Sequence, residues 1–149
     1  MTEYSESRLL PFRAADLFEI VADVEAYPSY IKGCKRVKVL SRSDNQLQAS
    51  VVAGIGPFCE TYTCTVYFDP PVSIRVAYGK GPFVHLENVW TFHSCHEAHE
   101  RISTQVDFYI SFLFRAPFYQ IMMEAIFKKM VQETIWSFEG EVYRRLRYK

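Results

Sequence analysis

The C-terminal stretch from Pro117 to Lys149 predicts a single long helix, and the rest of the chain has to fold around it. Proline suits the first helical turn, where the N–H groups have no partner within the helix, and no second proline follows. The basic residues from Arg144 to Lys149 complement the negative end of the helix dipole. Apolar residues and one threonine recur at helical spacing along one side: Met123, Phe127, Met130, Val131, Thr134, Ile135, Phe138, Val142 and Leu146.

The first half of this helix is apolar on its remaining sides as well. The residues that point away from the main stripe are Phe118, Ile121, Met122, Ala125 and Ile126. A helix that is apolar all round contacts apolar material on both sides. One side is expected to face the protein's own sheet, and the other to face a ligand, a membrane surface or a partner chain.

Residues 34 to 114 change to a period of two, which is typical of antiparallel strands joined by short turns. Strands are predicted at 36–43, 47–55, 58–68, 74–78, 86–92 and 102–112. Before them, a strand is predicted over Tyr4–Leu10 and a short helix over Ala14–Val24. A turn is predicted at Tyr27–Tyr30, because the residue before a proline is disfavoured in the helical region.

This order of elements predicts an α+β fold, in which an antiparallel sheet of about six or seven strands curls round the long helix. With 149 residues, the chain is expected to form one domain, over 1–149. Inward positions range from the small Ala49 and Ala53 to the large Trp90 and Phe108. Such a mixture either leaves an apolar cavity, the usual form of a small-molecule site, or packs solidly, and the residues alone favour neither.

Composition and charge narrow the functional classes. The 17 basic and 17 acidic residues give zero net charge, which argues against broad binding to nucleic acid. The four cysteines follow no metal or disulfide spacing, so a reducing compartment is expected. The N-terminus enters structure almost at once, so a transit peptide is expected to be absent or already removed. Phe108–Phe127 has the length of a membrane span, but Arg115, Pro117 and Glu124 interrupt it.

No catalytic motif is visible. Nucleophilic catalysis needs a nucleophile, a base and an orienting group, and the serines and cysteines have no such neighbours in the sequence. His85, Glu87 and Asp107 are predicted on the outer face of the sheet, and no acid or histidine is predicted to face inward. Asn88 is predicted to face inward, where its amide either bonds to the backbone or contacts a ligand.

The segment His93–His99 contains three histidines and Cys95, whose side chains are common metal ligands. No helical i, i+4 pair holds them in a metal-binding geometry, so a solvated hairpin end is predicted and no metal site. Cys59 and Cys64 are five residues apart in a strand, so they face opposite sides and cannot bind one ion together.

Four stretches follow one another in the order of a known family: Tyr4–Leu10, Leu17–Ile31 with Cys34, Gly56–Phe58 with Glu60–Thr63, and Gly81–Phe92. Together they resemble the coenzyme Q-binding branch, mitochondrial type, of the START-like, polyketide cyclase-like superfamily. The resemblance implies a helix-grip (START/Bet v 1-like) fold with a lipid-sized tunnel between sheet and helix. Cys64 and Val84 depart from the family pattern, in which a small polar and a basic residue are expected, so no charged contact beside His85 is implied.

The resemblance also implies a function, namely a non-enzymatic carrier or chaperone for ubiquinone that supports respiratory electron transport and quinone biosynthesis. Ubiquinone is the implied bound lipid, with no catalytic cofactor. The implied tunnel lining is Val51, Ile55, Tyr62, Val76, Tyr78, Leu86, Asn88, Trp90, Phe108, Phe112, Met123, Phe127 and Met130. The implied entrance and membrane contact is Tyr27, Pro28, Tyr30, Phe83, Phe114, Phe118, Tyr119, Ile121 and Met122.

The implied partners are ubiquinone or a related isoprenoid lipid and, peripherally, the matrix side of the mitochondrial inner membrane. Respiratory or quinone-synthesis complexes and a second copy of the chain are further candidates, and no nucleic acid is expected. Contact of the basic end, 144–149, with anionic lipid is a secondary expectation. A ribosome-associated role, like that of a bacterial ribosome-association toxin in the same superfamily, is the first alternative. A cyclase-like enzyme is the second, and an inward-facing acid or histidine would mark it.

Overall fold

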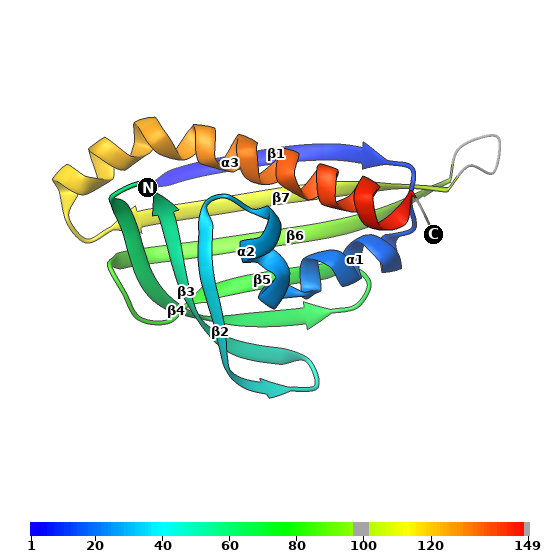
Figure 1. Cartoon of the computed structure of the whole chain (residues 1–149), viewed down its shortest axis with the longest axis horizontal. Coiled ribbons are helices and arrows are strands. Elements are labelled where there is room, and N and C mark those ends of the chain that lie inside the picture. The colour runs from blue at the N-terminus through cyan, green and yellow to red at the C-terminus, as the bar shows by residue number, and fades with distance from the viewer. Residues whose placement is uncertain (97–101, 148–149) are drawn as a thin grey trace.

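The structure, a computed structural model, describes residues 1–96 and 102–147 and is drawn in Figure 1. Its elements are, in order, β1 (Thr2–Leu10), α1 (Ala14–Ala22), a 3₁₀ turn (Val24–Ala26), α2 (Tyr27–Tyr30), β2 (Cys34–Ser43), β3 (Gln46–Ile55), β4 (Phe58–Asp69), β5 (Ser73–Tyr78), β6 (Phe83–His96), β7 (Ile102–Phe114) and α3 (Pro117–Leu146).

The seven strands form one antiparallel sheet in the order β1-β7-β6-β5-β4-β3-β2. Strands that follow one another from β2 to β7 pair as hairpins, and β1 closes the far edge by pairing with β7. Figure 1 shows the sheet curling beneath α3, which packs closely on β1, β7, α1 and α2. The predicted α+β architecture, a curved antiparallel sheet wrapped on a long C-terminal helix, is confirmed.

The strands alternate between an inward and an outward face, as a pleated backbone requires. On β4, Cys64 and Val66 are buried, whereas Tyr67 is exposed on the outer face. Gly54 is the residue that allows β3 to bend. Its φ is 148°, and a Cβ there would lie 2.0 Å from the Phe58 carbonyl oxygen, so only glycine fits this backbone.

Two groups of buried side chains form the core. The larger group joins α1 and the C-terminal half of α3 to the middle of the sheet. At its centre, the ring of Trp90 lies 4.8 Å from that of Phe108 and 5.0 Å from that of Phe138. The smaller group lies under the first turns of α3 and comprises Phe83, Leu86, Phe112, Phe114 and Met123.

α3 buries the predicted apolar stripe at Met123, Val131, Ile135, Phe138 and Val142. The helix ends at Leu146, and residues 148–149, which the predicted helix included, lie outside the described residues. The other apolar residues of its first half divide into two sets. Phe118 is 79 % exposed and Ile121 is 69 % exposed, whereas Ile126 packs on the smaller core group.

Polar contacts hold both ends of α3. Near the start, the buried Gln120 side chain accepts a hydrogen bond from the Phe114 N–H (2.8 Å) and donates one to Thr2 Oγ1 (2.9 Å). Near the end, the buried Glu141 carboxylate accepts hydrogen bonds from two arginines of the following turn, at 2.7 Å each. The middle of α3, residues 123–134, therefore spans the sheet between two anchors.

The segment Tyr27–Tyr30, predicted as a turn, is instead the one-turn helix α2. Tyr27 takes helical dihedral angles (φ −51°, ψ −45°) although Pro28 follows it. The Tyr27 hydroxyl donates a hydrogen bond to the Val21 carbonyl, and Pro28 occupies a first turn, where no N–H is needed. This tertiary contact outweighs the local preference on which the prediction rested.

Candidate functional site

A cavity of about 210 Å³ lies between the sheet and α3. Its wall is almost wholly apolar and takes side chains from α3, from α2 and the turn before it, and from strands β2 to β7. A cavity of about 150 Å³ holds one benzene ring, so this one holds a ring-sized group with a short chain, about ten non-hydrogen atoms. The core is therefore not packed solidly between the sheet and the middle of α3.

Most of the residues predicted for the tunnel lie on the wall of this cavity. Those that line it are Val51, Tyr62, Val76, Leu86, Asn88, Trp90, Phe108, Met123, Phe127 and Met130. They come from five strands and from three successive turns of α3, and the curl of the sheet brings them together. Their contact with a ligand stays a prediction.

Three predicted tunnel residues do not line the cavity. Phe112 is fully buried in the smaller core group, where its ring centre lies 3.9 Å from that of Phe127. The Tyr78 hydroxyl instead accepts a hydrogen bond from the Phe83 N–H at 3.1 Å. Ile55 ends β3 beside a turn. Strand alternation predicts the face of each residue, but it does not distinguish open space from a neighbouring side chain.

Asn88 is the polar group of the inner wall, and its amide is oriented by two neighbours. Its Nδ2 donates a hydrogen bond to the Tyr109 carbonyl at 2.9 Å. Its Oδ1 accepts one from Trp90 Nε1 at 3.2 Å. The backbone contact, one of the two alternatives that the sequence left open, is thus present. An amide has two N–H donors and two lone pairs, so Asn88 keeps one donor and one acceptor that these contacts do not use.

Glu60 also lines the cavity, which corrects the expectation that no acid faces inward. It lies half-buried on β4 in the same phase as Tyr62 and Cys64. On α3, the Tyr119 phenol faces it, and the pKa of Tyr119 is raised, first by burial and then by the Glu60 carboxylate. The alternation of β4 already contained this signal, since residues 58, 60, 62 and 64 share one face.

The titratable groups deeper in the wall are kept neutral by burial. Burial raises the pKa of Cys34 to about 11 and that of Cys64 to about 11. It also raises the pKa of Tyr62. Apolar surroundings disfavour the charged form of each group. The interior is therefore suited to binding an uncharged molecule by contact.

The outer face of the sheet holds the polar side chains predicted there. His85 Nε2 lies 2.7 Å from Ser111 Oγ. Asp107 accepts a hydrogen bond from Ser7 at 2.6 Å and pairs with His93 at 3.0 Å. The Ser7 hydrogen bond, above all, lowers the pKa of Asp107. These groups are separated from the cavity by the sheet itself, so they are surface contacts.

The predicted entrance residues do not form one patch. Phe83 and Phe114 are buried, with their rings stacked 4.4 Å apart, and both line the cavity, so the implied membrane contact does not include their side chains. Phe118 and Ile121 are exposed at the start of α3, and beside them are the half-buried Tyr119 and Met122. Tyr119 also belongs to the cavity wall.

Tyr27, Pro28 and Tyr30 lie near the other end of α3. The Arg145 guanidinium lies over the ring of Tyr30, 5.9 Å from its centre. At 1.5 Å per residue, Arg145 is about 40 Å along the helix from Phe118. Tyr27 lines the cavity, and Pro28 is exposed. Sequence position alone could not show that these aromatic residues lie apart from those at the start of α3.

One long side of the cavity runs between the middle of α3 and the ends of three strands. We call this side the seam. Its lining residues are half-buried: Gly33, Val37, Ala53, Phe58 and Glu60 on the strand side, and Tyr119, Phe127, Met130 and Thr134 on α3. Across the seam, a Cβ added to Gly33 would lie 3.2 Å from Met130 Cε, so these two residues lie close together. The Glu60–Tyr119 pair lies nearer the start of α3.

Over residues 1–96 and 102–147, no three His, Cys, Asp or Glu side chains lie together as metal ligands do. No helix in these ranges is both long enough and apolar enough to cross a membrane. Much of the histidine-rich hairpin end, including residues 97–99, lies outside the described residues.

Sequence comparison connects the chain with lipid-binding and ribosome-associated proteins. Residues 10–139 match the family described as "Polyketide cyclase / dehydrase and lipid transport". The mitochondrial coenzyme Q-binding protein COQ10 homolog B of Xenopus laevis is 32 % identical over 147 residues, which are 96 % of this chain and 60 % of the frog protein. The ribosome association toxin RatA of Vibrio cholerae is 29 % identical over 138 residues, which are 93 % of each chain.

Comparison of structures gives the same fold. The aromatase/cyclase ZhuI of a Streptomyces species superimposes with a TM-score of 0.82, covering 97 % of this chain and 95 % of the enzyme, at 17 % identity. At that identity the likeness concerns the fold alone. The cavity between a curled sheet and a long helix is thus set in an architecture that is also found in enzymes.

Proposed function

Because the chain belongs to the polyketide cyclase / dehydrase and lipid transport family, we propose that it binds ubiquinone in the cavity under α3 and acts as a carrier without catalysing a reaction. The observation that carries this proposal is the cavity itself, which is almost wholly apolar and has an oriented amide and a half-buried carboxylate among its few polar groups. A quinone carbonyl can accept a hydrogen bond from the Asn88 amide, and the carbon atoms of the quinone ring can contact the apolar wall.

The chemistry of the wall supports binding over catalysis. The Cys34 and Cys64 thiols and the Tyr62 phenol are neutral. His85, which neighbours the cavity residue Leu86 in the sequence, lies on the opposite face of the sheet. Burial of apolar ligand surface stabilises the complex by about 0.8 kcal/mol per methylene group. Binding of an isoprenoid lipid therefore needs no ion pair.

We place the protein, as part of this proposal, on the matrix side of the mitochondrial inner membrane in peripheral contact with it. The support is the name of the frog relative, which is a mitochondrial coenzyme Q-binding protein. The chain spans 60 % of the length of that relative. Respiratory or quinone-synthesis complexes are the proposed recipients of the lipid, and the exposed Phe118 and Ile121 are the proposed contact with a membrane or a second subunit.

A second candidate function is association with the ribosome. It is favoured by the Vibrio cholerae toxin, which the chain matches over 93 % of the length of both proteins. Co-sedimentation of the purified protein with ribosomal subunits distinguishes this candidate from the lipid carrier. A cyclase-like activity is the third candidate, and the rim carboxylate of Glu60 is the group on which it would depend.

The lipid-carrier proposal is tested by filling the cavity. Ala53→Phe places a ring into a space that holds about one ring, and it leaves the outer face unchanged. The protein is purified from quinone-producing cells, extracted with organic solvent and analysed by mass spectrometry. We expect quinone in extracts of the wild type and at least about tenfold less in extracts of the variant, as a loss of roughly 1.4 kcal/mol already gives.

Ala77→Phe is the matched control. Ala77 lies on β5 between Val76 and Tyr78, so it points to the outer face, and the same ring added there leaves the cavity open. Equal quinone content in the Ala53 variant and the wild type would contradict the proposal. So would the absence of quinone from every wild-type preparation.

A further inference from the structure

Residues 26–43 concentrate positive charge in a protein whose net charge is zero. This stretch contains five basic residues, Lys32, Lys35, Arg36, Lys38 and Arg42, and no acidic one. Since the whole chain has 17 basic and 17 acidic residues, the remainder has five more acidic than basic side chains. Zero net charge argues against broad binding to nucleic acid, but it leaves room for a local basic surface in this stretch, which contains α2, the following loop and all of β2.

Four of these cations are available to a partner. Lys32, Lys35, Arg36 and Lys38 are exposed, and none of them forms an ion pair with any described residue. We call these four residues the basic edge. Arg42 is different, because it pairs with Glu25 at 2.8 Å.

The basic end of α3, by contrast, is largely neutralised. Arg144 and Arg145 both bind the Glu141 carboxylate, and Arg145 also lies 3.8 Å from Asp23. The expected contact of residues 144–149 with anionic lipid is therefore better assigned to the basic edge. Residues 148–149 lie outside the described part of the chain.

The shape of β2 argues against another strand as the partner. β2 is an edge of the sheet, and its pairing with β3 is irregular at two places, between Cys34 and Arg36 and between Val39 and Ser41. Irregular edges rich in lysine and arginine discourage strand addition. The basic edge is thus suited to a surface of negative charge, and unsuited to a peptide added to the sheet.

The position of the basic edge relates it to the cavity. Gly33, Cys34 and Val37, which alternate with the basic residues, all line the cavity, and Gly33 contacts Met130 across the seam. Leu40, further along β2, is 51 % exposed. Any partner bound to the basic edge therefore lies against one wall of the seam.

We propose that the basic edge docks on an anionic lipid bilayer and thereby brings the seam to the membrane surface. A bilayer supplies negative headgroups for the lysines and arginines, and it supplies apolar chains next to an apolar opening. RNA would meet the same charges, but recognition of single-stranded RNA uses exposed aromatic side chains, and β2 has none. The inference rests on the proposed lipid-carrier function, since it assigns the route by which that lipid enters.

The test uses sedimentation with vesicles. Wild-type protein is mixed with vesicles of phosphatidylcholine containing about one third phosphatidylglycerol, or of phosphatidylcholine alone, at low and high salt. Each basic residue near an anionic bilayer contributes about a fivefold gain in binding, so the triple variant Lys35→Glu, Arg36→Glu, Lys38→Glu is expected to bind at least about 100-fold more weakly. Binding of the wild type is expected to weaken as salt is added, because salt screens exposed charges.

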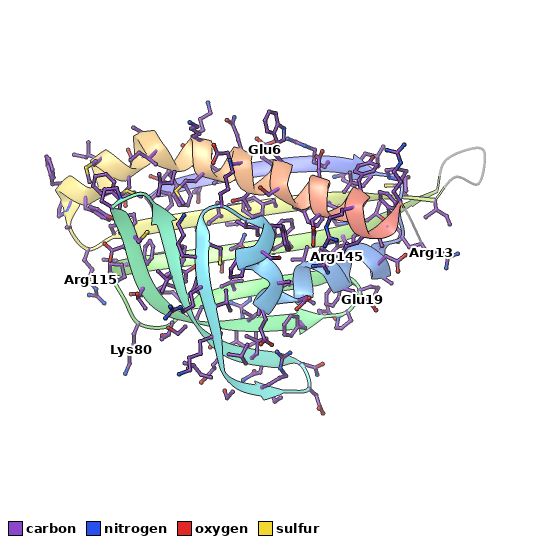
Figure 2. The ribbon with its side chains drawn as sticks, in the orientation of Figure 1. Glu6, Arg13, Glu19, Lys80, Arg115 and Arg145 are labelled. Carbon is purple, nitrogen blue, oxygen red and sulfur yellow. The ribbon has the colours of Figure 1, made fainter. Side chains whose placement is uncertain are left out.

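The control carries the same change of charge elsewhere. Arg13, Lys80 and Arg115, which point outward at the two ends of the molecule in Figure 2, are replaced together by glutamate. We expect the control to bind vesicles as the wild type does. A loss in the control with no loss in the β2 variant would place docking at an end of the molecule, near Phe118, and would overturn the inference.

Two further outcomes are decisive. Equal binding of the wild type to neutral and anionic vesicles would overturn the inference. So would loss of RNA binding in the β2 variant, if that variant binds anionic vesicles as well as the wild type does. Failure of docking is separable from failure of the carrier function, because binding of quinone added from detergent to the purified protein needs no membrane. A β2 variant that binds quinone added from detergent but does not bind anionic vesicles is the result we expect.

Discussion

At the scale of single residues, Asn88 is the group that most directly gives the cavity a preference among lipids. Its amide is held by the Tyr109 carbonyl and by Trp90 Nε1, so it is already oriented before a ligand arrives. A pre-oriented group loses little freedom on binding. The unused N–H can donate to a quinone carbonyl, and the unused lone pair can accept from a hydroquinone hydroxyl.

Asn88→Leu is expected to reduce the preference of the protein for a quinone over an isoprenoid hydrocarbon of equal chain length by about 1 kcal/mol, the usual net value of one hydrogen bond. The measurement is competition between the two lipids for purified protein. The variant is also expected to lose about 1–3 kcal/mol of stability, because Trp90 Nε1 is left unpaired. An unchanged preference together with lost stability would show that Asn88 only supports Trp90.

Single residues also show what the sequence could and could not reveal. The inward phase of Glu60 was visible, because it alternates with Phe58 and Tyr62 in one strand. The depth of a residue was not visible. Tyr78 and Tyr62 have the same phase on neighbouring strands, yet Tyr62 lines the cavity and the Tyr78 hydroxyl is bonded to Phe83.

At the scale of elements, α3 is a lid held at two ends. Gln120 joins its start to β1 and β7, and Glu141 holds Arg145, which reaches Asp23 after α1 and Tyr30 of α2. Arg144 above all, and then Arg145, lower the pKa of Glu141 to about 2 against the opposing effect of burial. Between these anchors the helix faces the seam. Motion that admits a ligand is therefore expected in the middle of α3 or in the loop at Gly33.

Glu141→Gln is expected to destabilise the protein by roughly 2 kcal/mol at pH 7, since each unit of pKa shift corresponds to about 1.4 kcal/mol and partial exposure of the arginines reduces the effect. The pKa of Glu141 in the folded protein lies below its ordinary value of 4.5. The stabilisation is therefore complete above about pH 4.5 and is lost as the pH falls toward 2.

Urea unfolding from pH 7 down to about pH 2 measures this dependence. The wild type is expected to lose the difference across the acid range, so that the two proteins become equally stable near the lower limit. Glu133→Gln is the control, because Glu133 lies on the same helix and forms no ion pair with a described residue. A constant gap between the Glu141 variant and the wild type at every pH would contradict the assignment.

The helices and strands were largely predictable from the sequence, but the contacts between elements distant in the sequence were not. Alternation located the strands to within a few residues, and helical spacing located α3, because both patterns are local. The one-turn helix α2 depends on a hydrogen bond from Tyr27 to Val21, which no local pattern contains. The division of the aromatic residues between the two ends of α3 is likewise a property of the assembled sheet.

At the scale of the whole molecule, the volume of the cavity limits what it can enclose. About 210 Å³, room for about ten non-hydrogen atoms, accommodates the ring of a quinone with its two oxygens and little of an isoprenoid chain. A longer chain has to leave through the seam, where Met130 and Gly33 are in contact. The molecule is thus expected to hold the ring firmly and the distant part of the tail loosely.

Quinones that differ only in tail length test this expectation. Affinity is expected to rise by about 0.8 kcal/mol for each methylene-sized group that is buried, and to stop rising within about the first isoprene unit. Titration followed by the fluorescence of Trp90, which lines the cavity, measures it. A constant gain continuing to long tails would mean instead that α3 moves and the whole tail is enclosed.

The two buried thiols have a consequence for the lifetime of such a ligand. A quinone is an electrophile, and the species that attacks it is the thiolate. With the pKa of Cys34 and that of Cys64 at about 11, roughly one thiol in ten thousand is ionised at neutral pH. The apolar wall that surrounds the quinone ring therefore also slows addition of the Cys34 and Cys64 thiols to that ring. A reactive molecule can reside beside two cysteines and leave chemically intact.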